Sequence, residues 1–161
     1  MRKQIAILFR KLLTLISPKL NTKYIYYRSF GRHINLKHPQ TLNEKVMWLK
    51  LYNYNNNALV AQCADKYLVR DYVAQCGCGD ILIPLCGVYD KFEDIDIDTL
   101  PKQFVIKSTY GSAMYIIVKD KQKADWESIR KQTRQWAKST YHLINSELQY
   151  STPRRIIIEH F

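Results

Sequence analysis

The spacing of apolar residues changes near Asp80, and this change constrains the fold more than any other feature of the chain. Before it, a capping-box sequence at 41–44 predicts a helix that runs to about Leu51, and residues 58–75 predict a second helix. After it, short apolar runs alternate as strands do. Helices followed by strands, with one helix covering the sheet, predict the α+β class. We expect strands over 81–88, 104–108, 115–119 and 155–161, and the covering helix over 125–140.

Positive charge is concentrated at the start of the chain. Residues 1–40 hold nine Lys and Arg and no Asp or Glu, whereas the remaining 121 residues carry 16 basic and 14 acidic side chains. We therefore predict a basic N-terminal segment, 1–40, in front of a nearly neutral domain, 41–161. A charge asymmetry of this kind indicates an anionic partner, either a membrane surface or a nucleic acid.

Residues 2–16 have the pattern of an amphipathic helix. Its polar half contains Arg10, Lys11 and Thr14, and Arg10-Lys11 also interrupts the apolar centre that a signal peptide needs. Two interpretations stay open: a helix lying on an anionic membrane, or a helix packed on the protein with its basic face in water. We expect Pro18 to end this helix and residues 19–40 to be irregular. The apolar half of the helical wheel holds Ile5, Ala6, Leu8, Phe9, Leu12, Leu13, Leu15 and Ile16.

Two other kinds of site are poorly supported. Within residues 19–40 the aromatics Tyr24, Tyr26, Tyr27 and Phe30 are interspersed with basic residues, but no RNA-binding signature accompanies them, so nucleic acid is not favoured. Cys76-Gly-Cys78 is too closely spaced for the usual metal pair, and no second pair completes a site. We predict no metal site and reduced, structural thiols in a cytoplasmic protein.

Phosphate binding is suggested by a lysine at the end of a predicted strand. Lys107 precedes the small residues Gly111 and Ser112, whose backbone amides could surround a phosphate. Lys66, expected in mid-helix, and Glu159, expected on the last strand, could point into the same cleft. Taken singly, each of these side chains is more typical of a solvated surface position.

Taken in order, several short blocks resemble the TupA-like (teichuronopeptide-biosynthesis) ATP-grasp family, whose members are often labelled glycosyltransferases. The resemblance covers about residues 40–161. The blocks are Asn43-Glu44-Lys45, Trp48-Leu49-Lys50, Ala64-Asp65-Lys66-Tyr67, Val69-Arg70, Tyr72-Val73, Ile83-Pro84-Leu85, Gly87-Val88, Asp90, Leu100-Pro101, Phe104-Val105-Ile106-Lys107, Gly111-Ser112, Ile116-Ile117-Val118-Lys119-Asp120 and Pro153-Arg154-Arg155-Ile156-Ile157-Ile158-Glu159.

The resemblance implies an enzyme that uses ATP and Mg²⁺ to ligate a carboxylate to an amine in bacterial surface-polysaccharide or teichuronopeptide biosynthesis. Such enzymes phosphorylate the carboxylate, here on a glycan or a peptide, and an amine then attacks the acyl phosphate. On this interpretation Lys66 and Lys107 neutralise the phosphates of ATP, and the Gly111-Ser112 loop closes over them. Glu159 lies at the hinge between two subdomains and contacts the adenine or ribose.

Two departures from the family pattern qualify this prediction. The loop reads Thr109-Tyr-Gly-Ser-Ala-Met114, where the family has a histidine and more glycines, and a Cβ atom restricts positive φ angles there. The chain also stops at the predicted hinge. We therefore expect the first part of an ATP-grasp fold, truncated before the C-terminal subdomain that holds Mg²⁺, with weak ATP binding and no assigned catalytic residue. Whether such a chain is an enzyme stays open.

Two alternative functions remain. A glycosyltransferase-type component of cell-surface glycan assembly would need an acidic metal motif, and Asp94-Ile-Asp96-Ile-Asp98 is the nearest candidate. A non-catalytic basic module would bind an anionic membrane through residues 2–16, which would place the protein at the inner face of the membrane.

Overall fold

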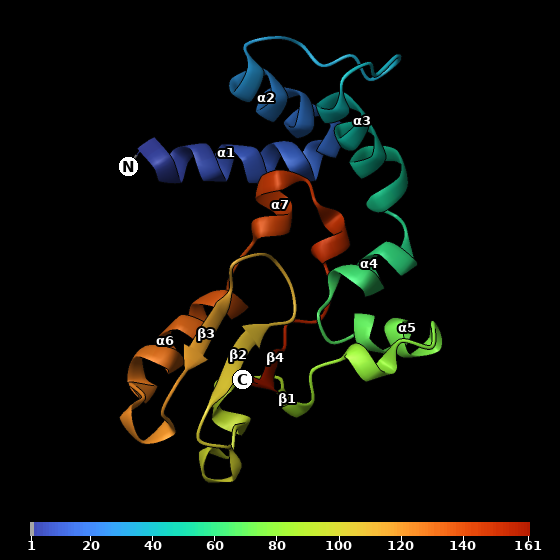
Figure 1. Ribbon diagram of the computed structural model, residues 1–161. Helices are drawn as coiled ribbons and strands as arrows, with labels where there is room; N and C mark the ends of the chain where they lie inside the picture. The colour runs from blue at the N-terminus through green and yellow to red at the C-terminus, as the bar shows by residue number, and fades with distance from the viewer. Residues whose placement is uncertain (1) are drawn as a thin grey trace. The chain divides into compact units, whose positions relative to one another are not determined.

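The computed structural model describes residues 2–161 (Figure 1). Its contacts divide the chain into two compact units, each built from two stretches of sequence. The first unit comprises the chain up to Ala61 together with Thr140–Ser151, and the second comprises Gln62–Ser139 together with Thr152–Phe161. This division does not test the domain boundary predicted at residue 40.

The first unit is helical. Residues 19–40, expected to be irregular, are helical as far as Phe30. The prediction was wrong because Pro18 does more than end the first helix: Ser17 caps a new helix whose first residue is Pro18, where the missing N–H costs nothing. The elements of this unit are α1 (Arg2–Ile16), α2 (Pro18–Phe30), α3 (Leu42–Leu49), a π-helical turn (Lys50–Tyr54), the start of α4 (Ala58–Ala64), α7 (Tyr141–Asn145) and a 3₁₀ turn (Leu148–Tyr150).

A buried cluster of polar side chains joins α1, α2 and the end of α7. Asn21 is fully buried, and its amide nitrogen, which carries two hydrogens, lies within hydrogen-bond distance of three acceptors: Thr14 Oγ1 at 2.7 Å, Ser146 Oγ at 2.9 Å and the Ile144 carbonyl at 3.0 Å. Thr14 and Ser146 share a further hydrogen bond of 2.8 Å. The apolar cluster of this unit is small, with Tyr26, Ile34 and Leu36 at its centre. Because buried polar groups are costly unless paired, this hydrogen-bonded cluster fixes how the helices meet.

The predicted capping box at the start of α3 is confirmed. Thr41 Oγ1 accepts from the Glu44 N–H, and the Glu44 carboxylate accepts from the backbone N–H groups of Asn35, Gln40 and Thr41. These backbone donors hold the negative charge in place and lower the pKa of Glu44 from 4.5 to about 2.

The second unit is built on a four-stranded antiparallel sheet with the order β1-β4-β2-β3. The predicted last strand lies in the middle of this sheet, so both of its edges are paired. The predicted strand over 81–88 begins only at Leu85, after a 3₁₀ turn and Pro84. The strands are β1 (Leu85–Tyr89), β2 (Phe104–Ser108), β3 (Tyr115–Val118) and β4 (Ile156–His160).

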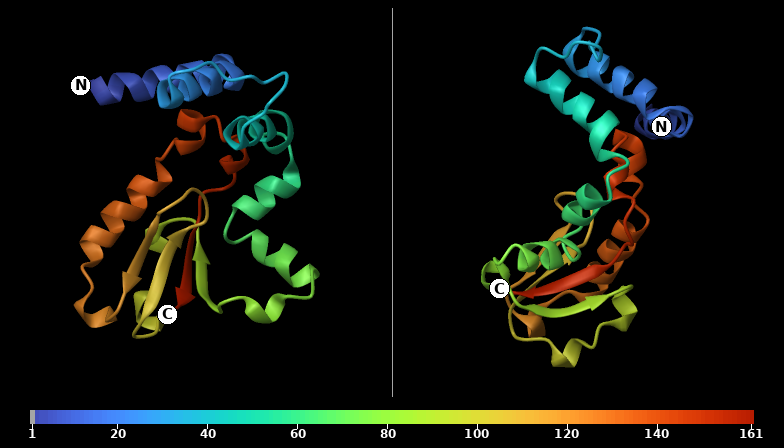
Figure 2. Two further views of the ribbon diagram at one scale, coloured as in Figure 1. Left: turned by 45° about the horizontal axis from the view of Figure 1, so that its top comes forward. Right: turned by 90° about the vertical axis from the view of Figure 1, so that its right-hand side faces the viewer.

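One face of the sheet forms the hydrophobic core. Helix α6 (Trp126–Ala137) packs there, as its spacing predicted, and buries Ile129 and Trp136 (Figure 2). Phe104 and Ile106 of β2 and the alternate residues Ile156 and Ile158 of β4 complete this core. The α+β class with a covering helix is thus confirmed.

The predicted helix over 58–75 is interrupted. It forms α4 and α5 (Val69–Gln75), separated by a turn at 65–68. Asp65 Oδ1 accepts from the backbone N–H groups of Tyr67 and Leu68, at 2.9 and 3.0 Å. An aspartate that bonds its own downstream backbone competes with helix hydrogen bonds, which explains the break. Within residues 2–161, each helix is too short or too polar to span a bilayer.

The capping box predicts a pH-dependent contribution to stability. Glu44→Gln should lower the free energy of unfolding at neutral pH, because the lowered pKa means that the folded state favours the carboxylate. This contribution is fully present above pH 4.5 and is lost as the pH falls through about 2. The difference in the free energy of unfolding between wild type and variant should therefore disappear over that interval. Urea unfolding at a series of pH values measures it. The surface variant Glu127→Gln is the control, and a gap that stayed constant down to pH about 2 would contradict the account.

Candidate functional site

A groove lies on the face of the sheet opposite α6. It has a volume of about 300 Å³, which is large enough for part of a nucleotide. Basic side chains and one carboxylate lie among aliphatic residues along its walls. The lining residues are Lys66, Val69, Arg70, Val73, Ile81, Leu82, Ile83, Lys107 and Glu159.

Strand register brings a lysine and a glutamate together in this groove. Lys107 is opposite Ile157 in the pairing of β2 with β4, so Glu159, two residues further along β4, is its diagonal neighbour on the same face. The Lys107 ammonium group forms an ion pair with Glu159 Oε2. The Glu159 side chain is only 9% exposed, so its charge must be matched inside the protein.

Arg70 of α5 supplies a second partner for the same carboxylate. Its Nη1 lies 3.5 Å from Glu159 Oε1, and its Nη2 donates to the Ile83 carbonyl at 2.7 Å. The guanidinium group therefore ties α5 to both the central strand and the segment before β1. Arg70 was not predicted as a site residue, although it lies four residues after Lys66 within the family-like blocks, and this position was the available signal.

Lys66 enters the groove because of the break after α4. Its backbone N–H is free of the helix and donates to the Thr109 carbonyl at 2.7 Å. Its ammonium group donates to the Gly111 carbonyl at 2.9 Å. Burial lowers the pKa of Lys66, the Asp65 carboxylate opposes this shift, and the positive charge of Lys107 adds to it. An anion that approaches this ammonium group would lower its free energy, because it would compensate for the water that the group has lost on burial.

The loop between β2 and β3 bears the strain expected from its unusual sequence. Gly111 has a φ angle of 72°, and Ala113 has one of 58°. Alanine pays a steric cost in this left-handed region that glycine does not. Ser112 is exposed, and Tyr110 is buried in the core instead of facing the loop.

The structure thus brings Lys66, Lys107 and Glu159 into one groove and links Gly111 to it through Lys66. Ser112 lies on the same loop but is not among the lining residues. What these five residues bind stays a prediction.

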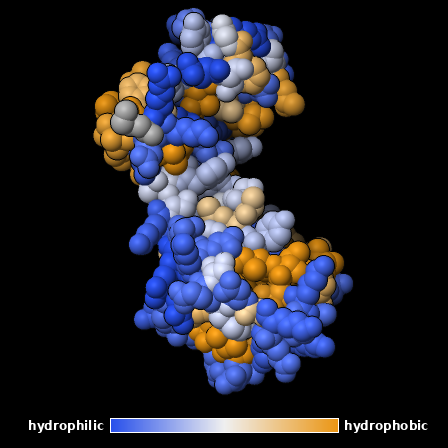
Figure 3. Space-filling view, turned by 90° about the vertical axis from the view of Figure 1, so that its left-hand side faces the viewer, coloured by the Kyte–Doolittle hydropathy of each residue, from blue (hydrophilic) through white to orange (hydrophobic). Residues whose placement is uncertain are grey.

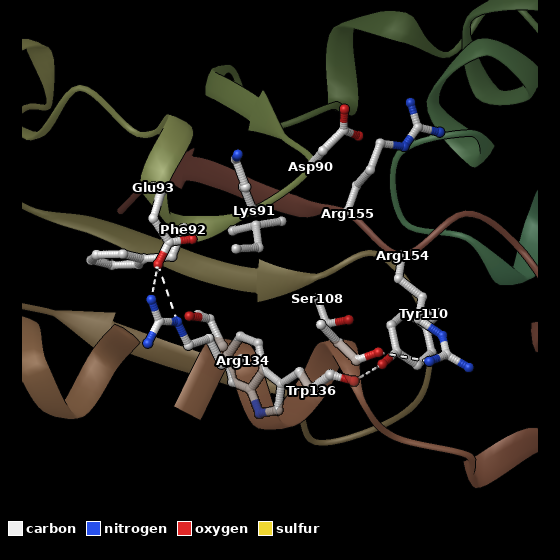
Figure 4. Close-up of a pocket in the computed structure, with 13 residues that line it drawn as sticks. Asp90, Lys91, Phe92, Glu93, Ser108, Tyr110, Arg134, Trp136, Arg154 and Arg155 are labelled. Carbon is white, nitrogen blue, oxygen red and sulfur yellow. Dashed lines mark hydrogen bonds and ion pairs between the residues drawn. The ribbon is translucent and has the colours of Figure 1, made fainter. Parts of the chain in front are cut away.

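A second cavity, on the core side of the sheet, is too small for a nucleotide. Its volume is about 50 Å³. Tyr110 fills one side, where its hydroxyl group donates to the Trp136 carbonyl and Arg154 lies 5.5 Å above its ring (Figure 4). Arg134 and Glu93 form an ion pair at its mouth. Because its volume is far below that of a nucleotide, we assign this cavity no ligand.

Acidic and sulfur-containing side chains form no metal site in the described part of the chain. Groups of three or more His, Cys, Asp or Glu that could hold an ion are absent from residues 2–161. Asp96, the centre of the acidic stretch, instead caps a 3₁₀ turn by accepting from the Asp98 N–H at 3.1 Å. The four cysteines are unpaired.

The ion pair between Lys107 and Glu159 should contribute measurably to the free energy of unfolding. Lys107→Met leaves the buried carboxylate with Arg70 alone, so we expect the free energy of unfolding to fall by about 1–3 kcal/mol. Urea denaturation measures this, with Lys119→Met as a surface control that should change it by less than ~0.5 kcal/mol. In a Glu159→Gln background, Lys107→Met should cost clearly less. Equal losses in both backgrounds would show that the two charges are not coupled.

Comparison with known proteins identifies the family. A family model described as TupA-like ATPgrasp matches residues 44–161, which is most of the chain and includes every residue that lines the groove. No curated protein and no solved structure matches the chain. The match and the α+β architecture agree, and the chain belongs to the TupA-like ATP-grasp family.

Proposed function

We propose that the groove binds the phosphates of ATP, and that the protein acts in ATP-dependent ligation of a carboxylate to an amine during assembly of a bacterial surface polysaccharide or teichuronopeptide. One observation carries this proposal: three cationic side chains, Lys66, Arg70 and Lys107, line the same groove as a single carboxylate, Glu159, in a chain from an ATP-grasp family.

The charge balance of the groove supports an anionic ligand. Three positive groups and one negative group line the groove, and an excess of positive charge remains even when the Asp65 carboxylate next to Lys66 is counted. Burial disfavours the charged form of Lys66, and a bound phosphate would compensate for the water that this ammonium group has lost. Lysine and arginine near the phosphates also stabilise the charge that develops when a phosphoryl group is transferred.

The link from Lys66 to the loop suggests how binding and closure are connected. In the structure the ammonium group of Lys66 donates to the Gly111 carbonyl. A phosphate that takes this hydrogen bond would release Gly111, and the loop with Gly111 and Ser112 could then cover the phosphates and exclude water. Glu159, held by Lys107 and Arg70, keeps further lone pairs for accepting a hydrogen bond from the ribose or adenine.

Mg²⁺, which the family uses with ATP, does not find a matching set of ligands in residues 2–161. We therefore assign no step to it and no catalytic residue. ATP supplies the phosphoryl group that activates the carboxylate of the glycan or peptide acceptor. The need for ATP and the four unpaired cysteines both favour a cytoplasmic protein.

Backbone NMR with added ATP tests the proposal. We expect shifts in the amide signals of Lys66, Lys107, Gly111 and Glu159, because these residues border the proposed phosphate position. The method detects millimolar as well as micromolar dissociation constants, so it does not depend on tight binding. Lys107→Gln should reduce the affinity by about tenfold or more, since it removes one charge-assisted contact.

The matched control is Lys119→Gln, which removes an exposed lysine beyond the end of β3 and should leave the shifts unchanged. Two results would refute the proposed site. One is that ATP changes the amide signals only of residues around the cavity beside Tyr110. The other is that Lys107→Gln and wild type bind ATP with equal affinity.

A further inference from the structure

Helix α1 packs with its polar side inward, contrary to what its amphipathic pattern leads one to expect of a helix in a globular protein. Thr14 is its buried residue, and Arg10 is partly buried. The apolar side chains on the opposite side are between 50% and 74% exposed. We call these residues the apolar stripe: Ile5, Leu8, Leu12, Leu15 and Ile16.

Specific contacts hold the helix in this orientation. Thr14 hydrogen-bonds to Ser146 and accepts from Asn21, and Arg10 donates to Asn145 Oδ1 at 2.6 Å. Rotating α1 to bury the apolar stripe would break these bonds and leave polar groups without partners. The stripe therefore faces outward because of the way the first unit is built. Figure 3 shows hydrophobic residues at the surface in the upper part of the view, where α1 and α2 lie, among hydrophilic ones.

The charges around the stripe indicate what covers it. At about 100° per residue, Arg2 and Lys11 lie about 90° to either side of the centre of the stripe. Arg2 is exposed and Lys11 is half-buried, and Lys19 and Lys23 of the neighbouring helix α2 are exposed. Because residues 1–40 contain nine basic residues and no acidic one, a second copy of this surface would be repelled, whereas an anionic surface would be attracted.

We propose that the apolar stripe and its flanking basic residues bind an anionic lipid bilayer, with α1 lying in the plane of the interface. The helix has 15 residues and is about 22 Å long, so it suits the interface and not the full thickness of the bilayer. The apolar side chains enter the boundary between headgroups and acyl chains, and the basic side chains contact the headgroups. The second interpretation of residues 2–16, a packed helix with its basic face in water, differs from the structure, because the packed side of α1 is the polar one that holds Thr14 and Arg10.

Co-sedimentation of the full chain with vesicles tests this proposal. We expect binding to mixed phosphatidylcholine–phosphatidylglycerol vesicles that is at least about tenfold tighter than to pure phosphatidylcholine and that weakens with salt. Leu8→Glu with Leu12→Glu should lose at least about tenfold in affinity. These changes leave the polar contacts of α1 intact, and circular dichroism checks that the variant folds.

The control is Leu42→Glu with Leu59→Glu, which makes the same change at two exposed leucines outside the stripe and should bind as wild type does. A second variant, Arg2→Gln with Lys11→Gln, should lose the preference for anionic vesicles and keep the weaker binding to neutral ones. Three results would overturn the proposal: equal binding to both kinds of vesicle, unchanged binding in the Leu8/Leu12 variant, or a dimer in vesicle-free buffer that this variant dissociates.

Discussion

The buried carboxylate of Glu159 is the constraint on which the second unit depends. A charge on the central strand of a sheet is costly to remove from water and is tolerated only when it is paired. Lys107 from β2 and Arg70 from α5 supply the pairing, and Arg70 also holds the segment before β1 through the Ile83 carbonyl. One acidic side chain thus orients two cations, one helix and the start of a strand.

The alternation of β4 separates the two functions of the sheet. Ile156 and Ile158 point into the core beneath α6, whereas Ile157 and Glu159 belong to the other face. The same five-residue strand therefore contributes apolar area to the core and a fixed charge to the groove. A shift of one residue in register would exchange these faces, so the hydrophobic core also fixes the position of the candidate site.

Local signals in the sequence predicted more than long-range ones. The capping box at Thr41, the two strands around the loop and the apolar face of α6 each depend on neighbouring residues, and all were predicted. The break at Asp65 was missed because helical periodicity continues through it, while the side chain bonds to the next turn. The start of α2 was missed because Pro18 was interpreted only as a helix terminator.

Contacts between distant residues explain the remaining differences. The pattern of α1 predicts an amphipathic helix but cannot tell which face packs, because the partners Asn145 and Ser146 are more than 130 residues away in sequence. Arg70 gains its importance only when α5 meets β4, and this requires the strand order β1-β4-β2-β3. Resemblance to the family identified Lys66, Lys107 and Glu159 as a group. Considered one at a time, each of these residues was more typical of a solvated surface position.

The central claim is that the groove binds the phosphates of ATP. Covalent labelling with an ATP derivative that carries an acyl group on its terminal phosphate tests this claim most directly. A lysine beside the terminal phosphate attacks the acyl carbon, the bond from that carbon to the phosphate oxygen breaks, ATP leaves, and the lysine keeps the acyl group as an amide that mass spectrometry locates. If the groove binds the phosphates of ATP, Lys66 or Lys107 should be acylated, and excess ATP should suppress this. Acylation confined to surface lysines such as Lys19 and Lys119, with no protection by ATP, would contradict the account.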